Sequence, residues 1–300
     1  MIPLSPGLWL MEPTAFRRLA ARREVSLPGI DLDEPPGDGP GDPARSYAVR
    51  DGVAVLPLAG TIYPRPSLEW WFDGMVDGAA VALDHFNAAL DAALADPRVR
   101  SILLDVDSPG GLATGVAETA DRVRAADARK PTAAYVRDTA ASAAYWIATA
   151  AGEVVAHPTA RLGSIGVLGV AYDDTERLAK AGIRRKVIVS DQSPNKALDP
   201  FTDAGELALK REFNALADRF VAAVARHLGV PEPDVLTDFG GGDVLPAPEA
   251  VEVGMAHRLG SAADAHARLA ARSAAPTAFR VLPAASRAAA AAPRIRFGVR

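Results

Sequence analysis

The sequence predicts one α/β domain, because apolar strand-like runs alternate with segments of helical periodicity over most of its length. The run 102–106 is apolar on both faces, as strands buried within a parallel sheet are. A glycine pair, Gly110 and Gly111, follows this run, and Ser142 opens a helix after a later one. Functional groups gather beyond the carboxyl ends of parallel strands. These two positions therefore carry the functional prediction.

Each element is predicted from its periodicity and from the residues that interrupt it. Strand 53–58 precedes a helix whose apolar residues recur from Leu83 to Leu94, and Asp96-Pro97 stops that helix. A helix follows strand 102–106 and the glycine pair. The remaining expected elements are strand 132–136, the helix opened by Ser142, strands 153–156, 165–171 and 186–189, helix 203–227, helix 248–253 and a closing segment 256–259.

Composition narrows the classes of protein that the chain can belong to. Its 49% hydrophobic and 23% charged residues are typical of a globular protein with an ample core. A net charge of -4 gives no reason to expect nucleic acid or anionic membrane as a partner. The absence of cysteine excludes disulfides and thiolate metal ligands, and the five histidines lack zinc-binding spacing, so we expect no cofactor or metal.

Three regions are expected along the chain. Residues 1–45 form an N-terminal arm and a linker rich in Pro, Gly and Asp at 28–43, residues 46–270 form the main domain, and residues 271–300 form a flexible Ala-rich tail. The arm is expected to be amphipathic, with an apolar face made of Leu8, Leu10, Met11, Phe16 and Leu19.

No segment has the features of a membrane span or an export signal. No stretch reaches the roughly 18–20 apolar residues of a membrane-spanning helix. Residues 1–23 also lack the basic start and apolar run of a secretory signal. We therefore expect a cytoplasmic protein.

Ser142 is a candidate nucleophile. It lies between alanine pairs at the start of a helix, where the lack of bulk exposes its hydroxyl. The amides of Gly110, Gly111 and Ala143 could then stabilise an oxyanion. The alternative is that Ser142 is an ordinary helix N-cap, which is the commonest role of serine at a helix start. The preceding glycine pair, one strand–helix unit earlier, favours the nucleophile.

A serine nucleophile needs a base. His157 is the histidine nearest in sequence, but it precedes a proline and is expected in a surface turn. Lysine is scarce among the 33 basic residues, so a retained lysine can indicate a need for a cation that deprotonates, which arginine cannot do. Lys196, in an irregular segment after a predicted strand, is the preferred base, although Asp199 could pair with it and keep it charged. The other lysines are Lys130, Lys180, Lys186 and Lys210.

With these residues in place, the chain resembles the signal peptide peptidase A-like serine peptidases, and among them the phage protein C branch of prohead proteases. The resemblance covers roughly residues 48–269. Membrane-anchored members begin with a hydrophobic segment that is not seen here, which favours the phage branch. The motifs that carry the resemblance lie at 58–62, 105–111, 141–143, 163–167, 190–200 and 249–259.

The resemblance implies a ClpP/crotonase-like spiral of ββα units and a serine endopeptidase with a Ser-Lys dyad. Ser142 matches the nucleophile, Lys196 the general base and Ser164 a serine that orients the lysine. Gly110 and Ala143 match the oxyanion donors. A ring-like homo-oligomer with active sites shared between subunits is implied, as are protein substrates such as capsid scaffold, portal or the chain itself, in the host cytoplasm or in an assembling prohead.

Several alternatives remain open at this stage. They are a housekeeping peptidase that degrades leader peptides, a crotonase-like acyl-CoA enzyme, a ClpP-type Ser-His-Asp peptidase and a non-catalytic shell component. The aromatic run 70–72 is expected either to pack in the core or subunit interface, or to line an apolar substrate groove.

Overall fold

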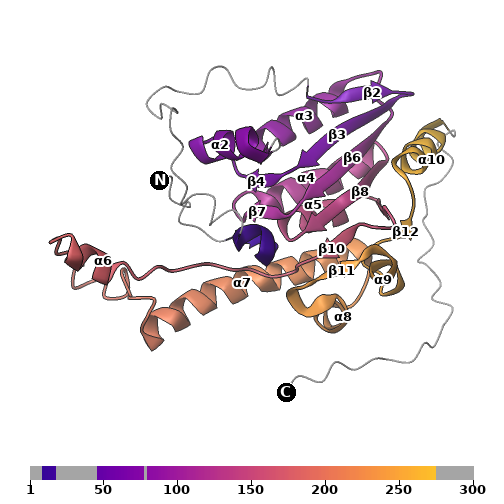
Figure 1. The fold of residues 1–300 in the computed structure, drawn as a ribbon. Coiled ribbons are helices and arrows are strands. Elements are labelled where there is room, and N and C mark those ends of the chain that lie inside the picture. Colours follow the sequence, from indigo (N-terminus) through magenta and orange to yellow (C-terminus); the bar gives the residue numbers. More distant parts are fainter. Residues whose placement is uncertain (1–8, 18–45, 78–79, 275–300) are drawn as a thin grey trace.

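A computed structural model of the chain describes residues 9–17, 46–77 and 80–274 (Figure 1). The linker expected at 28–43 lies outside the described residues, and so does the expected tail 271–300 beyond residue 274. The described part is an α/β structure built on two sheets, with parallel pairing in both. The α/β prediction is therefore confirmed.

The larger sheet has eight strands and places the carboxyl ends of its parallel strands together. The long strand β8 pairs with β9 through its first half and with β10 through its second half, where Ala141 lies opposite Gly163. The strands of this sheet are β2 (Ala48–Arg50), β3 (Val53–Ala59), β6 (Ser101–Ser108), β8 (Thr132–Ala141), β9 (Glu153–Ala156), β10 (Arg161–Gly163), β11 (Val244–Pro246) and β12 (Arg258–Leu259).

Both faces of this sheet are covered, as its continuous apolar strands predict. Alternate residues such as Leu56 and Leu104 point into the main core beneath the helices of one face, whereas Leu103 and Tyr135 pack with Leu269 of α10 on the other. Figure 1 shows α10 on the side of the sheet away from α3 and α4. The helices that cover the sheet are α3 (Leu83–Ala95), α4 (Val116–Arg129), α5 (Ala143–Thr149) and α10 (Ala262–Ala274).

The smaller sheet has the order β1-β7-β4-β5 and includes the glycine pair. Gly111 lies beside Ile62, and a Cβ on Gly111 would overlap the Ile62 carbonyl, so the close parallel pairing requires glycine. The strands are β1 (Trp9–Met11), β4 (Thr61–Tyr63), β5 (Ala80–Ala82) and β7 (Gly110–Leu112), and α2 (Leu68–Asp77) precedes β5.

The N-terminal arm differs from its prediction. Residues 9–11 form a strand, so Leu10 enters the main core while Met11 packs on the opposite side with Phe16 and Tyr63. The expected single apolar face is wrong for Leu10 and Met11, because side chains alternate along a strand. Leu8 and Leu19 lie outside the described residues.

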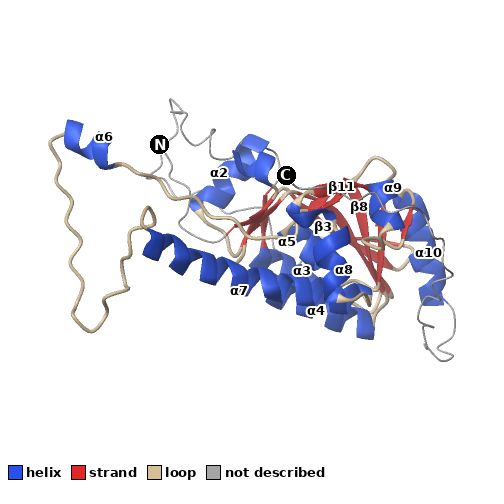
Figure 2. Cartoon of the chain, turned by 90° about the horizontal axis from the view of Figure 1, so that it is seen from below, coloured by secondary structure: helices blue, strands red, loops and turns tan. Residues whose placement is uncertain are grey.

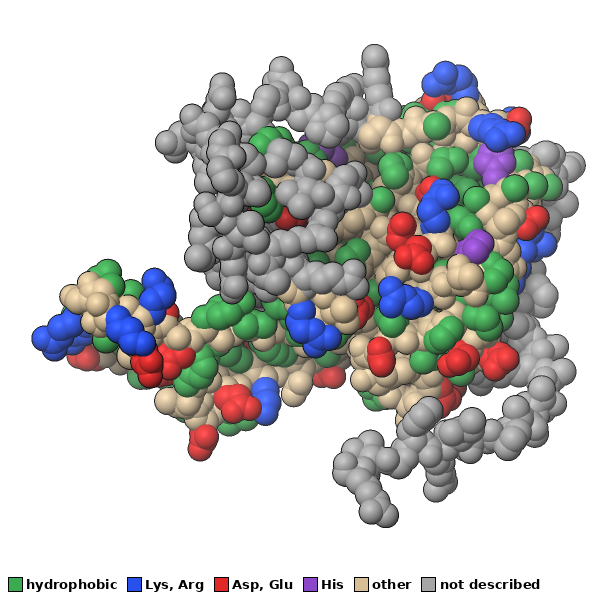
Figure 3. Space-filling view, in the orientation of Figure 1, with side chains coloured by type: hydrophobic (Ala, Val, Ile, Leu, Met, Phe, Trp, Pro, Cys, Tyr) green, Lys and Arg blue, Asp and Glu red, His purple; other side chains and the backbone are tan. Residues whose placement is uncertain are grey.

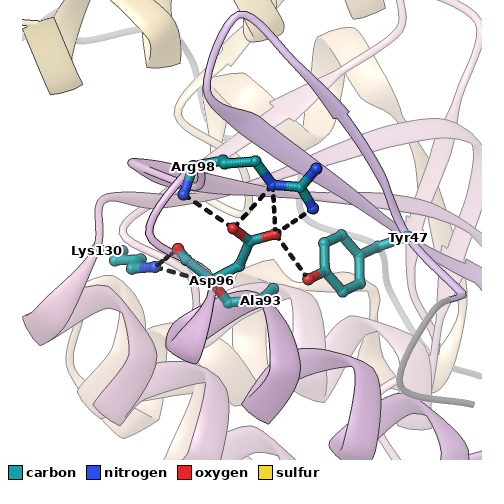
Figure 4. A network of polar contacts seen from close by, with 5 residues as sticks. All are labelled: Tyr47, Ala93, Asp96, Arg98 and Lys130. Atoms are coloured by element: carbon teal, nitrogen blue, oxygen red, sulfur yellow. Dashed lines mark hydrogen bonds and ion pairs between the residues drawn. The ribbon is translucent and has the colours of Figure 1, made fainter.

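A polar network closes the C-terminal end of α3, and Figure 4 shows its members. The Lys130 ammonium donates to the carbonyls of Ala93 and Asp96, each at 2.9 Å. The Asp96 carboxylate accepts from Arg98 and from the Tyr47 hydroxyl. Helix C-termini leave carbonyls without partners inside the helix, and this lysine supplies two donors. Lys130 therefore has a structural role.

Helix α7 (Asp203–Leu228) extends beyond the rest of the fold. Apart from Gly205, its buried residues lie in its C-terminal half, where Phe220 stacks on Trp146 of α5 with 4.7 Å between ring centroids. Its other half and α6 (Thr175–Lys180) form a projection that stands clear of the strands in Figures 1 and 2. We call residues 170–209 the projecting arm. The remaining helices are α8 (Glu232–Asp238), the 3-10 turn η2 (Gly240–Gly242) and α9 (Ala247–Glu252).

Two predicted strands are wrong. Residues 165–171 form only an isolated bridge, between Leu168 and Trp9, and residues 186–189 have no strand beside them in the described part of the chain. Both segments are apolar enough to be strands. A strand also needs a neighbour for its backbone, and the chain leaves the sheet after β10.

Within the described ranges, no helix is both long enough and apolar enough to cross a membrane.

His227 makes the fold sensitive to acid. The ring is 8% exposed, its Nδ1 lies 3.1 Å from Thr149 Oγ1, and its Nε2 has no partner among the described residues. Burial, helped by Arg226 and Arg124 and opposed by Asp121, lowers the His227 pKa from 6.5 to about 4. The unfolded chain therefore binds a proton that the folded chain excludes. This contribution to stability is complete above pH 6.5 and is lost as the pH falls toward 4.

We expect the free energy of unfolding in urea to fall by about 2 kcal/mol between pH 7.5 and pH 5 through this group. The variant His227→Gln should lose that share of the pH dependence, whereas His266→Gln, at a partly exposed ring that lies beside Arg50 O, should keep it. Equal pH dependence in the wild type and His227→Gln would contradict the assignment.

Candidate functional site

Ser142 occupies a sharp turn between β8 and α5. Its backbone angles are φ 52° and ψ -118°, a conformation that side-chain-bearing residues rarely adopt. The turn is held by a hydrogen bond from Ser142 N to Gly163 O at 2.7 Å and by one from Trp146 N to Ser142 O at 3.0 Å. Such strain costs about 1–3 kcal/mol and is concentrated at functional sites. A strained strand-to-helix turn that presents a serine is the arrangement of a nucleophile elbow.

The Ser142 hydroxyl is buried and has no hydrogen-bond partner among the described residues. It makes no capping bond to α5, so the N-cap interpretation is wrong. An unpaired buried hydroxyl is costly, and native proteins rarely keep one without a reason. The side chain is thus held ready for a partner that the described chain does not supply.

Gly110 lies directly against this turn. It has φ 95°, and a Cβ there would lie 3.0 Å from Ala141 O and 3.1 Å from Ala143 N, and would overlap the Leu10 carbonyl oxygen. Only glycine fits, because the space and the backbone angle both exclude a side chain. The structure therefore brings Gly110 and the Ala143 amide together, as the sequence predicts for oxyanion donors, and Gly111 follows in β7.

Ser108 supports this glycine turn and was not singled out by sequence reasoning. Its buried hydroxyl donates to Gly60 O at 2.6 Å and accepts from Gly110 N at 3.1 Å. It thereby fixes the direction of the Gly110 amide. The signal available in the sequence was its place two residues before a glycine pair at a strand end.

Ser164 follows β10 as Ser142 follows β8. Since Gly163 and Ala141 are paired in register, the two serines begin neighbouring turns. Ser164 also has a positive φ, 53°, is 4% exposed, and donates its amide to Asp243 O at 2.7 Å. The structure therefore places Ser164 at the same sheet edge as Ser142.

Asp107 lies near the carboxyl end of β6, one residue before Ser108. Burial and the neighbouring Asp138 raise the pKa of its carboxyl, while the amide of Thr139 donates to it at 3.3 Å and opposes that rise. Asp107 is a structural acceptor that links the ends of β6 and β8.

Lys196 is not brought to these residues within the chain. It lies in the exposed connection between α6 and α7, which Figure 2 shows well away from the strands. Its amide donates to Ser193 O at 3.0 Å. The neighbouring Asp199 carboxylate accepts from Phe201 N, and no ion pair joins it to Lys196 in the described structure. The pairing with Asp199 that would keep this lysine charged is therefore absent here.

Two other candidates from the sequence, His157 and the aromatic run 70–72, make contacts within the fold. His157 lies in a turn where Nδ1 is 2.8 Å from Thr159 Oγ1, as expected of a surface histidine. In the aromatic run, Phe72 is buried and the Trp70 indole donates to Ala80 O at 3.1 Å, so these rings pack within the fold. Trp70 also packs against the cluster that contains Trp9 and Met11 of β1.

Comparison with known proteins agrees with this geometry. Peptidase family S49 matches residues 124–275, the stretch that holds Ser142, Ser164 and Lys196. The chain belongs to peptidase family S49. Its two sheets of alternating strands and helices are consistent with the ClpP-like fold of that family.

This S49 chain is similar to two phage proteins. It is 33% identical over 225 residues to the head-tail preconnector protein GP5 of Enterobacteria phage P21, covering 74% of this chain and 44% of that protein. It is 33% identical over 252 residues to the capsid assembly protease C of Escherichia phage lambda, covering 82% of this chain and 54% of that one. The S49 chain thus spans about half the length of these relatives.

A cellular relative is similar over a shorter stretch. Protease 4 of Salmonella typhi is 30% identical over 205 residues, which cover 66% of this chain and 32% of that protein.

We expect Gly110→Ala to destabilise the fold more than Gly254→Ala. Both glycines have a similar positive φ, 95° and 90°, but a Cβ on Gly254 meets nothing within 4 Å. The control should lose about 1–2 kcal/mol for the backbone angle alone. Gly110→Ala should lose about 1–3 kcal/mol more because of overlap. Urea unfolding measures both losses, and equal losses would show that the space at Gly110 is not tight.

Proposed function

We propose that this chain is a serine endopeptidase in which Ser142 is the nucleophile and Lys196 the general base. The observation that carries the proposal is the strained, buried Ser142 hydroxyl, which has no partner among the described residues and lies beside Gly110 and the Ala143 amide. Membership of family S49 supports the same chemistry.

The reaction follows from these positions. Ser142 Oγ attacks the carbonyl carbon of a peptide bond as its proton passes to the neutral Lys196 amine. The Ala143 amide stabilises the oxyanion that forms, and the Gly110 and Gly111 amides join it once Gly110 N leaves the Ser108 hydroxyl to which it donates in this structure. Lys196 then protonates the departing amine. In the second half, Lys196 takes a proton from water as the water attacks the acyl carbon, and it returns that proton to Ser142 Oγ as the ester bond breaks. Ser164 orients the lysine.

In this proposal Lys196 comes from a neighbouring copy of the chain. Lys196 belongs to the projecting arm, so a second subunit is needed to bring it to Ser142. Figure 3 shows hydrophobic side chains along this projection, and exposed apolar surface of this extent is typical of an interaction site. The large exposed side chains there are Val170, Tyr172, Ile183, Val187, Ile188, Val189, Phe201, Leu207 and Leu209.

A groove lies where the projecting arm joins the fold and offers a neighbouring copy a place to pack. It has a volume of about 890 Å³ and is lined by Thr114, just after β7, by Phe213 and Leu216 on α7, and by residues of the arm itself, among them Val170 and Leu209. Repeating one such head-to-tail contact closes a ring, and each subunit then completes its neighbour's site.

The proposed biological role is capsid maturation, with scaffold, portal or the chain itself as substrate, in the host cytoplasm or inside an assembling prohead. The similarity to a capsid assembly protease and a head-tail preconnector protein supports this role. A general peptidase of leader fragments shares the chemistry but lacks that support. A crotonase-like acyl-CoA reaction would leave the strained Ser142 turn without a purpose.

We expect Ser142→Ala and Lys196→Ala each to lower peptide hydrolysis by at least about a thousandfold, because the dyad acts as a unit. Mixed in equal amounts and reassembled, the two inactive variants should recover about one quarter of wild-type activity, since each head-to-tail contact can join an intact serine to an intact lysine. Hydrolysis of an unfolded protein substrate measures both effects.

Lys180→Ala is the matched control, because Lys180 also lies on the projecting arm and forms a surface ion pair with Glu176. It should keep wild-type activity. Full activity in Lys196→Ala would refute the base assignment. Inactive single variants that gain nothing on mixing would contradict the shared site.

A further inference from the structure

Strand β1 lies in a slot between two segments of the serine site. On one side it pairs antiparallel with β7, with Leu10 opposite Gly111 and Met11 opposite Gly110. On the other side Trp9 exchanges two backbone hydrogen bonds with Leu168, each 3.0 Å long. One wall of the slot therefore begins with the glycine pair, and the other follows Ser164 by four residues.

The backbone of β1 reaches the oxyanion donors. A Cβ placed on Gly110 would overlap the Leu10 carbonyl oxygen and lie 3.1 Å from Ala143 N. The Leu10 carbonyl oxygen and the Ala143 amide nitrogen therefore lie on the same side of Gly110. Both are close to the point that a Gly110 Cβ would occupy, so they are also close to each other. A substrate carbonyl must occupy this neighbourhood to be attacked by Ser142.

The side chains of β1 point alternately to two sides of the slot. Leu10 is fully buried in the main core cluster, which also contains Ala143 and Leu162. Trp9 and Met11 point the other way, and the Trp9 ring meets Phe16 edge-on with 5.5 Å between centroids. The slot thus provides an apolar pocket for one residue of an extended segment, and Leu10 fills it.

The chain turns away immediately after the slot. Glu12 N donates to Pro109 O at 2.8 Å, and the Glu12 carboxylate accepts from the amides of Thr14 and Ala15. These bonds start a helical turn, so only three residues fill the slot in strand form. A short strand added to a sheet edge is the usual way an extended peptide binds.

We infer that Trp9–Met11 is an internal substrate mimic that blocks the peptide-binding slot, with Leu10 at the position of the residue whose carbonyl Ser142 attacks. The inference rests on the proposed peptidase function. It assigns the substrate as an extended segment with a branched apolar residue before the cleaved bond. Substrates bind only when β1 leaves the slot.

The test measures binding without turnover, in the full chain carrying Ser142→Ala. A fluorescent peptide with the sequence of residues 7–14 should bind at least about tenfold more tightly when Leu10→Asp is added, because a carboxylate in the apolar pocket expels β1 and the open fraction sets apparent affinity. Leu269→Asp, at a buried leucine of α10, is the matched control and should leave the affinity unchanged. Unchanged or weaker binding to a folded Leu10→Asp chain would overturn the inference.

A second measurement avoids any loss of folding in Leu10→Asp. In the chain with Ser142→Ala alone, saturating peptide should speed hydrogen exchange at the Trp9 amide, which loses its bond to Leu168, while the Leu168 amide stays protected by the peptide. If the Trp9 amide stays protected under saturating peptide, β1 does not leave the slot, and the inference is overturned. Neither readout needs Lys196 or turnover, so failure of the proposed peptidase activity would be recognised separately.

Discussion

The parallel pairing of β8 with β10 is the constraint on which the site depends. It sets Ala141 opposite Gly163, and the next residue, Ser142, donates its amide to the Gly163 carbonyl. The chain must then reverse at once into α5, whose residues are all buried. Because both ends of the turn are held by packing, Ser142 keeps a backbone conformation that it would leave in an unconstrained peptide.

The crowding around this turn explains why small residues surround it. Gly110 approaches both Ala141 and Ala143, and Gly111 approaches Ile62. A larger residue at Gly110 would push β7 away from the Ser142 turn, and one at Gly111 would disrupt the pairing of β7 with β4 inside the smaller sheet. The Ser108 hydroxyl then bridges the turn back to Gly60, so the smaller sheet and the larger one are tied together beside the candidate nucleophile.

Two features of the described chain, the Ser142 hydroxyl and the projecting arm, each lack a contact that the other could supply from a second copy. The Ser142 hydroxyl lacks a partner inside the fold, and the projecting arm carries apolar side chains and a lysine outside it. Each would be costly in a protein that worked alone, since unpaired buried hydroxyls and large exposed apolar surfaces both raise the free energy. The proposed assembly of copies would remove both costs, which is the physical argument for proposing a shared site. The inferred blocking of the slot by β1 would add a restraint inside each copy.

Local sequence patterns are enough to predict the α/β class, most of the central strands and helices, and the residue types of the candidate site. Strand 102–106 is predictable because strands buried on both faces of a parallel sheet are continuously apolar. The helix from Leu83 is predictable from the spacing of its apolar residues. The glycine pair and Ser142 were recognisable because backbone geometry limits which residues such turns accept. The other features depend on contacts between segments far apart in the chain. Pairing needs a partner strand, so residues 9–11 became a strand beside the site, whereas residues 165–171 and 186–189 did not form strands. The distance of Lys196 from the sheets likewise depends on where α7 projects, which no local pattern encodes.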